Sequence, residues 1–172
     1  LLNNNTIYDT INFMTDYKVQ VCTGRQIPRF DSDVFSSWQT INYSKFLCPE
    51  KRDRVVNVKK TIFKKMNSYY KRLCCVIDDV FVIYNKDFFH LIGKYDENYH
   101  YGEDLELGKR IIEKGYPIAY LYSNGVIHSH NRSPSYFVKR IFVDNIFLQK
   151  VFQEKNHTYI FSHLQIEQLL IS

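Results

Sequence analysis

The sequence has little glycine and proline, with six glycines and four prolines among its 172 residues. This scarcity excludes collagen-like and low-complexity chains, which are rich in one or both of these residues. Long apolar runs are also missing, and the longest fall far short of the roughly 20 residues that a membrane-spanning helix needs. No apolar signal core stands near the start of the sequence, where residues 3–5 are asparagines. We therefore expect a cytoplasmic protein that does not span a membrane.

The four cysteines, Cys22, Cys48, Cys74 and Cys75, form no C-x-x-C pair. An adjacent pair such as Cys74 and Cys75 suits neither a zinc knuckle nor an ordinary disulfide framework. Because disulfides are rare in the cytosol, reduced thiols are the expected state.

Apolar residues make up 45% and charged residues 24% of the sequence, which is ordinary for a globular domain and argues against disorder across the body of the chain. Aromatic residues reach 16%, with 14 tyrosines and 13 phenylalanines, so we expect an aromatic-rich core. A chain of this length can bury one such core and fits one domain or part of a larger one.

The net charge of +5 is unevenly distributed. Nine basic residues and one acid lie between Lys51 and Arg72, which gives that stretch +8 and leaves −3 for the rest of the chain. A basic stretch that also holds aromatic residues can be a solvated face, or it can meet an anionic membrane surface or an anionic substrate. No nucleic acid partner is expected, because no helix-turn-helix, RRM or KH motif accompanies the charge.

Hydrophobic periodicity predicts helices and short strands that alternate along the chain. The predicted helices cover residues 7–17, 34–43, 61–72, 86–92, 104–114 and 136–152. The predicted strands cover residues 19–22, 76–84 with an interruption at 78–79, 118–121 and 126–130. We expect a loop over 25–33, because Pro28 forbids a helix there, and an irregular segment over 48–58. Such alternation is typical of an α/β layered domain.

Two adjacent carboxylates, Glu103 and Asp104, open the predicted helix 104–114. An acidic residue at this position can cap free N–H groups and interact favourably with the helix dipole. It can also serve as a general base, held by a rigid helix beside a cleft with a second carboxylate next to it. The residues alone leave both interpretations open.

His128 and His130 follow a predicted strand and are separated by one residue. Alternate side chains of an extended segment point the same way, so the two imidazoles can face one site. Neutral imidazole is a common metal ligand. The alternative is a pair of surface histidines, and the other four histidines of the chain have no comparable context.

Two further acidic pairs have a poor setting for a metal site. Asp31 and Asp33 have D-x-D spacing, which suits Mg²⁺ or Mn²⁺, but they lie in a polar loop rather than at the end of a buried strand. Asp78 and Asp79 lie closer to a strand, yet pleating would send adjacent side chains to opposite faces. We interpret the first pair as unrelated to metal binding and the second as structural or at the edge of a cleft.

The order of several short motifs is more specific than any one of them. They are FFHLIGKYDE at 88–97, GEDLEL at 102–107, KR at 109–110, KGYPI at 114–118 and VIHSH at 126–130. This order resembles the second half of a family-two glycosyltransferase with the GT-A fold. There the pattern runs F-x-x-I-G-G-F-D-E, E-D-x-D/E-L, R, G-Y-x-I and then a histidine after a strand. GRQIPR at 24–29 and NY at 42–43 are similar to the bacterial rhamnosyltransferase branch of that family.

The chain departs from the family pattern in detail and in extent. Lys94 and Tyr95 replace the second glycine and the phenylalanine of G-G-F-D-E, and Asn85-Lys86 replaces a basic pair. The family's first half, which binds the nucleotide and ends in a strand-borne D-x-D, has no counterpart here. The resemblance therefore implies the C-terminal half of a GT-A mixed sheet flanked by helices. Residues 1–150 would form its acceptor-side part and residues 151–172 a helical tail.

The resemblance also implies a chemistry. Family members transfer a sugar from a nucleotide-diphospho-sugar donor to an acceptor hydroxyl with inversion at the anomeric carbon. Asp104 would be the general base and Glu103 its neighbour. His128 would join the D-x-D outside this chain in holding Mg²⁺ or Mn²⁺, and His130 would line the same site. Arg25 and Gln26 would touch donor or acceptor.

The implied partners are the donor, a saccharide or lipid-linked saccharide acceptor and the missing half of the domain. A peripheral contact with the inner face of the membrane is a further expectation, because 11 of the 17 residues over 136–152 are apolar. Packing of this helix under the tail is the alternative.

Two other functions stay open, an inactive binding or structural remnant and a metal-dependent hydrolase that uses Asp104 and His128.

Overall fold

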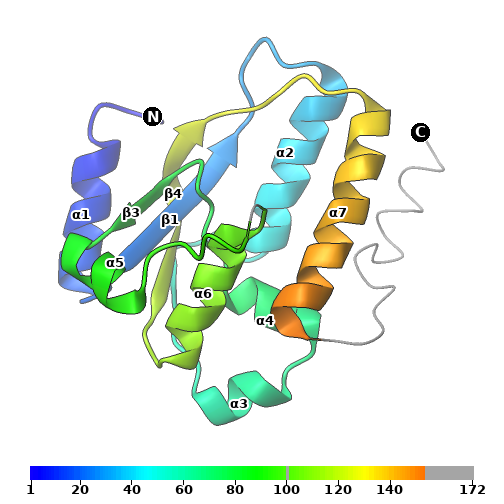
Figure 1. Cartoon of the computed structure of the whole chain (residues 1–172). Coiled ribbons are helices and arrows are strands. Elements are labelled where there is room, and N and C mark those ends of the chain that lie inside the picture. The colour runs from blue at the N-terminus through cyan, green and yellow to red at the C-terminus, as the bar shows by residue number, and fades with distance from the viewer. Residues whose placement is uncertain (100, 154–172) are drawn as a thin grey trace.

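The computed structural model describes residues 1–99 and 101–153 of the chain. Helices and strands alternate along it, as the sequence predicts (Figure 1). The helices are α1 (Thr6–Asp16), α2 (Val34–Leu47), α3 (Lys60–Lys65), α4 (Ser68–Cys74), α5 (Lys86–Ile92), α6 (Glu103–Glu113) and α7 (Pro134–Phe152). The strands are β1 (Val21–Ile27), β2 (Arg54–Val56), β3 (Val82–Tyr84) and β4 (Ile118–Ile127).

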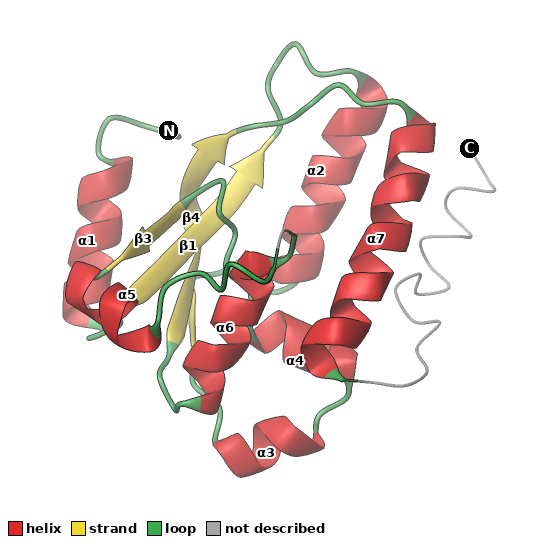
Figure 2. Ribbon diagram, in the orientation of Figure 1, coloured by secondary structure: helices red, strands yellow, loops and turns green. Residues whose placement is uncertain are grey.

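The four strands form one mixed sheet in the order β2-β4-β1-β3. The central strands β1 and β4 run parallel, and each edge strand is antiparallel to its neighbour. Helices lie on both sides of this sheet (Figure 2). The prediction of an α/β fold, with a mixed sheet flanked by helices, is confirmed.

The two faces of the sheet bury different sets of side chains, as the alternation of a strand requires. Cys22, Ala119 and Leu121 face α1, where Phe13 and Met14 pack against them. On the opposite face, the main core gathers buried side chains from β1, α5, α6, β4 and α7, among them Val21, Phe88, Leu107, Ile111, Ile112, Ile118 and Val151. Helix α6 is thereby fixed against the sheet, which gives its N-terminal end a rigid position.

Helix α1 forms where the sequence predicts a helix, but the face that it buries does not contain the apolar residues Ile7 and Ile11. Ile7 and Ile11 are about half exposed, whereas Thr6 and Thr10 are fully buried. The buried amide of Asn124 donates to the carbonyl oxygen of Thr6 at 2.7 Å and to Oγ1 of Thr10 at 3.1 Å. Because a buried amide needs acceptors, this polar contact decides which face of α1 meets the sheet.

Strand β1 continues through residues that the sequence analysis assigned to a loop. Arg25, Gln26 and Ile27 pair with residues 125–127 of β4 after a shift in register between Gly24 and Arg25. The two extended segments predicted around 118–121 and 126–130 are accordingly one strand, β4, that ends at Ile127. The loop prediction was wrong for 25–27 because a parallel neighbour, invisible in the local sequence, supplies hydrogen bonds up to Pro28.

The segment between α4 and β3 also differs from its prediction. Only Val82–Tyr84 forms a strand, while Val76 and Ile77 are buried in irregular backbone. The backbone N–H of Asp78 donates to Oγ1 of Thr23 at 3.1 Å, so a side chain satisfies the N–H that a strand partner would have taken.

Three helix and strand boundaries differ from those that the sequence predicted. The predicted helix 61–72 is two short helices, because Asn67 caps α4 by accepting from the N–H of Tyr70. The predicted irregular segment 48–58 contains β2. Helix α2 runs four residues beyond its predicted end, to Leu47. The predictions for α5, α6 and α7 are confirmed within two residues.

Helix α7 buries only part of its apolar surface within the described part of the chain. Val138, Phe142 and Ile146, four residues apart, are each at least half exposed, whereas Leu148 and Val151 are buried. The predicted helical tail lies outside the described residues, apart from its first three. Among the described helices, none combines the length and the apolar character that crossing a bilayer requires.

Close packing of α6 against α4 depends on Gly108. A Cβ atom at this position would overlap the carbonyl oxygen of Cys75, and both residues are buried. We expect Gly108→Ala to lower the free energy of unfolding by about 3 kcal/mol, at the upper end of the cost of overpacking, despite the better helix propensity of alanine. Chemical denaturation measures the change. Gln149→Ala, at an exposed position of α7, is the control, and equal stability of the two variants would contradict the packing argument.

Candidate active site

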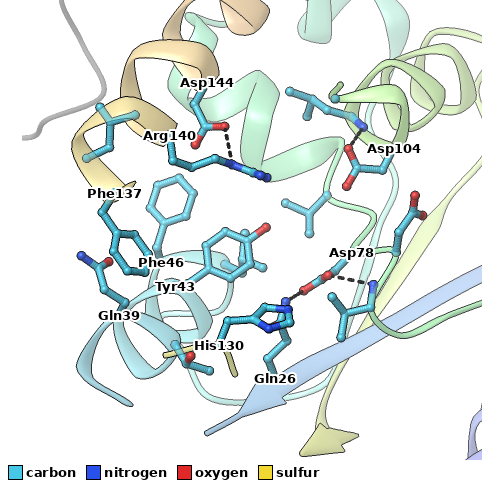
Figure 3. A pocket seen from close by; sticks show the side chains of 18 of the residues that line it. Gln26, Gln39, Tyr43, Phe46, Asp78, Asp104, His130, Phe137, Arg140 and Asp144 are labelled. Carbon is cyan, nitrogen blue, oxygen red and sulfur yellow. Dashed lines mark hydrogen bonds and ion pairs between the residues drawn. The ribbon is translucent and has the colours of Figure 1, made fainter. Parts of the chain in front are cut away.

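One cavity of about 670 Å³ holds most of the residues that the sequence singled out. It lies between α2, α7, the N-terminal end of α6 and the carboxyl ends of β1 and β4 (Figure 3). Its volume is in the range of small-molecule sites. Its lining includes Gln26, Asp78, Asp79, Glu103, Asp104, His128 and His130.

Asp104 occupies the first turn of α6 and is held there by the helix behind it. The N-cap position is Gly102, whose left-handed backbone (φ 72°) starts the helix without a side-chain cap. Oδ1 of Asp104 accepts from the N–H of Leu105 at 2.7 Å, which is one of the first-turn N–H groups that have no partner within the helix. The carboxylate of Asp104 therefore caps α6 locally and also lines the cavity, so the geometry is compatible with both interpretations.

The surroundings of Asp104 disfavour its charged form. Burial, followed by the negative charge of Asp79, raises the pKa of Asp104 to about 7. Glu103 and Asp78 add smaller effects in the same direction. A carboxyl group with a pKa near neutrality is well matched to accept a proton from a hydroxyl group near pH 7.

A hydrogen-bonded chain joins Asp78 to His128 through Gln26. Nε2 of Gln26 donates to Oδ2 of Asp78 at 2.7 Å, and Oε1 of Gln26 lies 2.9 Å from Nδ1 of His128. With the amide in this orientation, Nδ1 of His128 carries the proton and Nε2 carries the lone pair. Burial lowers the pKa of His128, which also favours the neutral ring that binds metals.

The prediction that two imidazoles would gather at one place agrees with the geometry. The rings of His128 and His130 lie 4.6 Å apart, edge to face, and both line the cavity. The backbone N–H of His128 donates to the carbonyl oxygen of Ile27 at 2.8 Å, so the pairing of β1 with β4 fixes where the histidine segment begins.

Asp78 and Asp79 both line the cavity, so the expectation of opposite faces was wrong. Their segment is irregular rather than pleated, and strand alternation does not apply to it. Oδ1 of Asp79 accepts from the hydroxyl of Tyr95 at 2.6 Å, and that hydroxyl lies 3.0 Å from the hydroxyl of Tyr84. Burial raises the pKa of both carboxyl groups.

Arg25 and the D-x-D pair lie outside the cavity lining. The guanidinium of Arg25 stacks over the ring of Tyr122, 4.3 Å from its centroid, whereas its neighbour Gln26 faces the cavity. Asp31 pairs with Arg29 at 2.5 Å. Asp33 caps α2, where its carboxylate accepts from the N–H of Ser36 at 2.7 Å.

Some cavity residues were not expected from the sequence. Tyr101 precedes the glycine that starts α6, and its hydroxyl donates to Oδ1 of Asp144 on α7. Arg140 lies over the Tyr101 ring at 4.2 Å and places Nε 3.5 Å from Asp144. This contact ties α7 to the start of α6. Arg132 also lines the cavity, as do Arg72, which ends the basic stretch, and Tyr43, which belongs to the NY motif. For Arg140 the available clue was an Arg-x-x-x-Asp spacing at 140–144, which is common on helices.

The described residues offer a metal ion one ligand, His128, and not a complete group of ligands. Among the described residues, no group of three or more histidine, cysteine, aspartate or glutamate side chains could hold a metal. His128 nevertheless has a suitable form, because Gln26 engages Nδ1 and leaves the Nε2 lone pair without a partner in the described part of the chain. It fits a metal site that carboxylates from elsewhere complete.

Replacing Asp104 with Asn should make stability less dependent on pH. The pKa of Asp104 is raised in the folded protein, so wild-type stability falls as pH rises from about 4, where an unfolded aspartate ionises, to about 7, where the folded one does. We expect Asp104→Asn to match wild type near pH 4 and to exceed it by more than about 1 kcal/mol above pH 7. Thermal unfolding across this range tests the shift, and a difference independent of pH would contradict it.

Sequence comparison gives two curated relatives, both from Salmonella. The chain is 26% identical over 147 residues to the O-antigen chain rhamnosyltransferase WbaN of Salmonella anatum, and 25% identical over 149 residues to RfbN of Salmonella typhimurium, which has the same description. These alignments cover 84% and 86% of this chain but only 42% and 43% of the relatives, so the chain spans about two fifths of their length. No family model matches the chain, and no solved structure does. The similarities support a relationship to glycosyltransferases.

Proposed function

We propose that this chain forms the acceptor-side part of an inverting glycosyltransferase with the GT-A fold. The enzyme transfers a sugar from a nucleotide-diphospho-sugar to an acceptor hydroxyl in bacterial polysaccharide biosynthesis. The single observation that carries the proposal is Asp104, a half-buried carboxyl at a rigid helix start inside the cavity, with a pKa of about 7. The order of motifs around it and the names of both relatives support the same reaction class.

Asp104 acts as the general base of this reaction. An acceptor hydroxyl is a poor nucleophile until its proton is removed, and the carboxylate takes that proton as the oxygen attacks the anomeric carbon. The bond from that carbon to the diphosphate oxygen breaks on the opposite side, which inverts the configuration. Glu103 lies beside Asp104 in the same lining and hydrogen-bonds the acceptor. Its negative charge also raises the pKa of Asp104.

His128 would hold a divalent metal ion together with carboxylates from outside this chain. Mg²⁺ or Mn²⁺, when bound, supplies the positive charge that stabilises a leaving diphosphate. Within this chain, the hydrogen bonds from Asp78 through Gln26 fix the orientation of the His128 ring. His130 packs edge to face on that ring and limits its rotation. Gln26 therefore positions His128, and its contact with donor or acceptor stays a prediction.

Activity of the full-length protein tests the role of Asp104. With nucleotide-activated sugars, rhamnose-type donors first, we expect Asp104→Asn to reduce turnover by about 10² or more, as loss of a positioned base does. Glu103→Gln should cost less. Asp16→Asn, an exposed carboxylate of α1 outside the cavity, is the control. Turnover by folded Asp104→Asn at the wild-type rate would refute the assignment, and retention at the anomeric carbon, detected by NMR, would refute inversion.

We also propose a peripheral contact between α7 and an anionic bilayer that carries a lipid-linked acceptor. Val138, Phe142 and Ile146 form an exposed apolar stripe, and the basic stretch from Lys51 to Arg72 supplies attraction to anionic lipid.

The full-length protein should sediment with anionic vesicles, and salt should release part of it. Phe142→Ser should weaken this binding several-fold. Leu91→Ser, equally exposed on α5, should not, and equal effects of the two changes would exclude α7 as the contact.

A further inference from the structure

Three arginines line the same cavity as Asp104 but have no role in the proposed chemistry. Arg72 comes from α4, Arg132 from the segment before α7, and Arg140 from α7. They are far apart in the sequence, and only the fold brings them to one cavity. Figure 3 shows the side chain of Arg140 reaching into this space from α7, with Tyr43 facing it from α2.

Each of these guanidinium groups is held over an aromatic ring. Arg140 lies over Tyr101 at 4.2 Å, Arg132 over Tyr136 at 5.1 Å and Arg72 over Phe46 at 5.4 Å from the ring centroid. Stacking on a ring uses the flat face of a guanidinium and leaves its N–H edge available for hydrogen bonds. The three side chains are thus oriented without losing their donors.

Most of this positive charge has no counterpart in the protein. Arg140 has Asp144 at 3.5 Å, but the guanidinium groups of Arg72 and Arg132 form no ion pair or hydrogen bond with any other described residue. The same cavity contains four other carboxylates besides Asp144, on Asp78, Asp79, Glu103 and Asp104, and none of these four pairs with an arginine in the described part of the chain. Charges of opposite sign therefore share one cavity largely without pairing, which leaves Arg72 and Arg132 free for an anionic ligand.

Several guanidinium groups in one cavity suit a ligand with several anionic oxygens, such as a diphosphate, better than a single carboxylate. Guanidinium edges bind phosphate oxygens in a bidentate manner, and several arginines from separate elements match the several oxygens of a diphosphate. We propose that Arg72, Arg132 and Arg140 form a diphosphate-binding subsite beside Asp104. The inference rests on the proposed function, which requires a diphosphate-bearing substrate at this cavity. The diphosphate can belong to the sugar donor or to a diphosphate-linked acceptor.

Binding of inorganic pyrophosphate to the full-length protein, measured by calorimetry, tests the subsite without requiring turnover. We expect Arg72→Gln and Arg132→Gln each to weaken binding about tenfold, the effect of losing a charge-assisted hydrogen bond, and the double variant to weaken it further. Arg140 is left intact because it also contacts Asp144. Arg52→Gln, an exposed arginine outside the cavity, makes the same change of charge and should leave the affinity unchanged.

Steady-state kinetics then distinguish the two sources of the diphosphate. If the donor supplies it, the arginine variants raise the KM of the nucleotide-diphospho-sugar. If the acceptor supplies it, they raise the KM of a diphosphate-linked saccharide and not that of the same saccharide without the diphosphate. Either pattern supports the subsite and identifies its substrate.

The subsite and the proposed function can fail separately. Pyrophosphate affinity equal to wild type in the double variant would overturn the subsite even if sugar transfer is intact. An equal loss in Arg52→Gln would also overturn it, because the effect would then reflect overall charge. Arginine-dependent binding of pyrophosphate in a protein that transfers no sugar would keep the subsite and reject the transferase.

Discussion

The parallel pairing of β1 with β4 is the constraint on which the site depends. Its register shifts once, between Gly24 and Arg25, and the pairing then continues to the contact between the N–H of His128 and the carbonyl oxygen of Ile27. Because the carboxyl ends of parallel strands meet at one edge of a sheet, Gln26 and His128 arrive within hydrogen-bonding distance from positions 102 residues apart. Without the shift, Gln26 would pair with Ser123 rather than with Val126, and His128 would lie three residues farther along β4 from it.

A second constraint fixes the opposite wall of the cavity. Helix α6 is seated by Leu107, Ile111 and Ile112, which are completely buried, and it approaches α4 closely at Gly108. Its N-terminal end is tied to α7 through Tyr101 and the Arg140–Asp144 pair. The carboxylate of Asp104 is therefore positioned by packing on three sides and not by a loop. This is the kind of support that a general base needs to meet a hydroxyl at hydrogen-bonding distance.

Local patterns predicted the fold class, α5, α6 and α7, and the residues Asp104 and His128 as candidates. They failed where a distant partner decides the outcome. The extent of β1 depends on β4, the buried face of α1 depends on Asn124, and the irregular backbone at Asp78 depends on Thr23. Arg132 and Arg140 were missed for the same reason, since each is an ordinary basic residue in its own segment, whereas Arg72 belongs to the basic stretch for which an anionic substrate was one interpretation.

The cavity gathers unpaired charges of both signs, and this arrangement costs stability. Apart from Asp144, which pairs with Arg140, four carboxylates line the cavity. Burial and mutual repulsion raise the pKa values of Asp78, Asp79 and Asp104, which means that the folded state opposes their ionisation. A fold selected for stability alone would pair these acids with the arginines of the same lining. Left unpaired, the acids include a carboxyl suited to accepting a proton, and Arg72 and Arg132 keep donors for an anion. The proposed transfer of a sugar from a diphosphate to a hydroxyl requires both capacities of a single site.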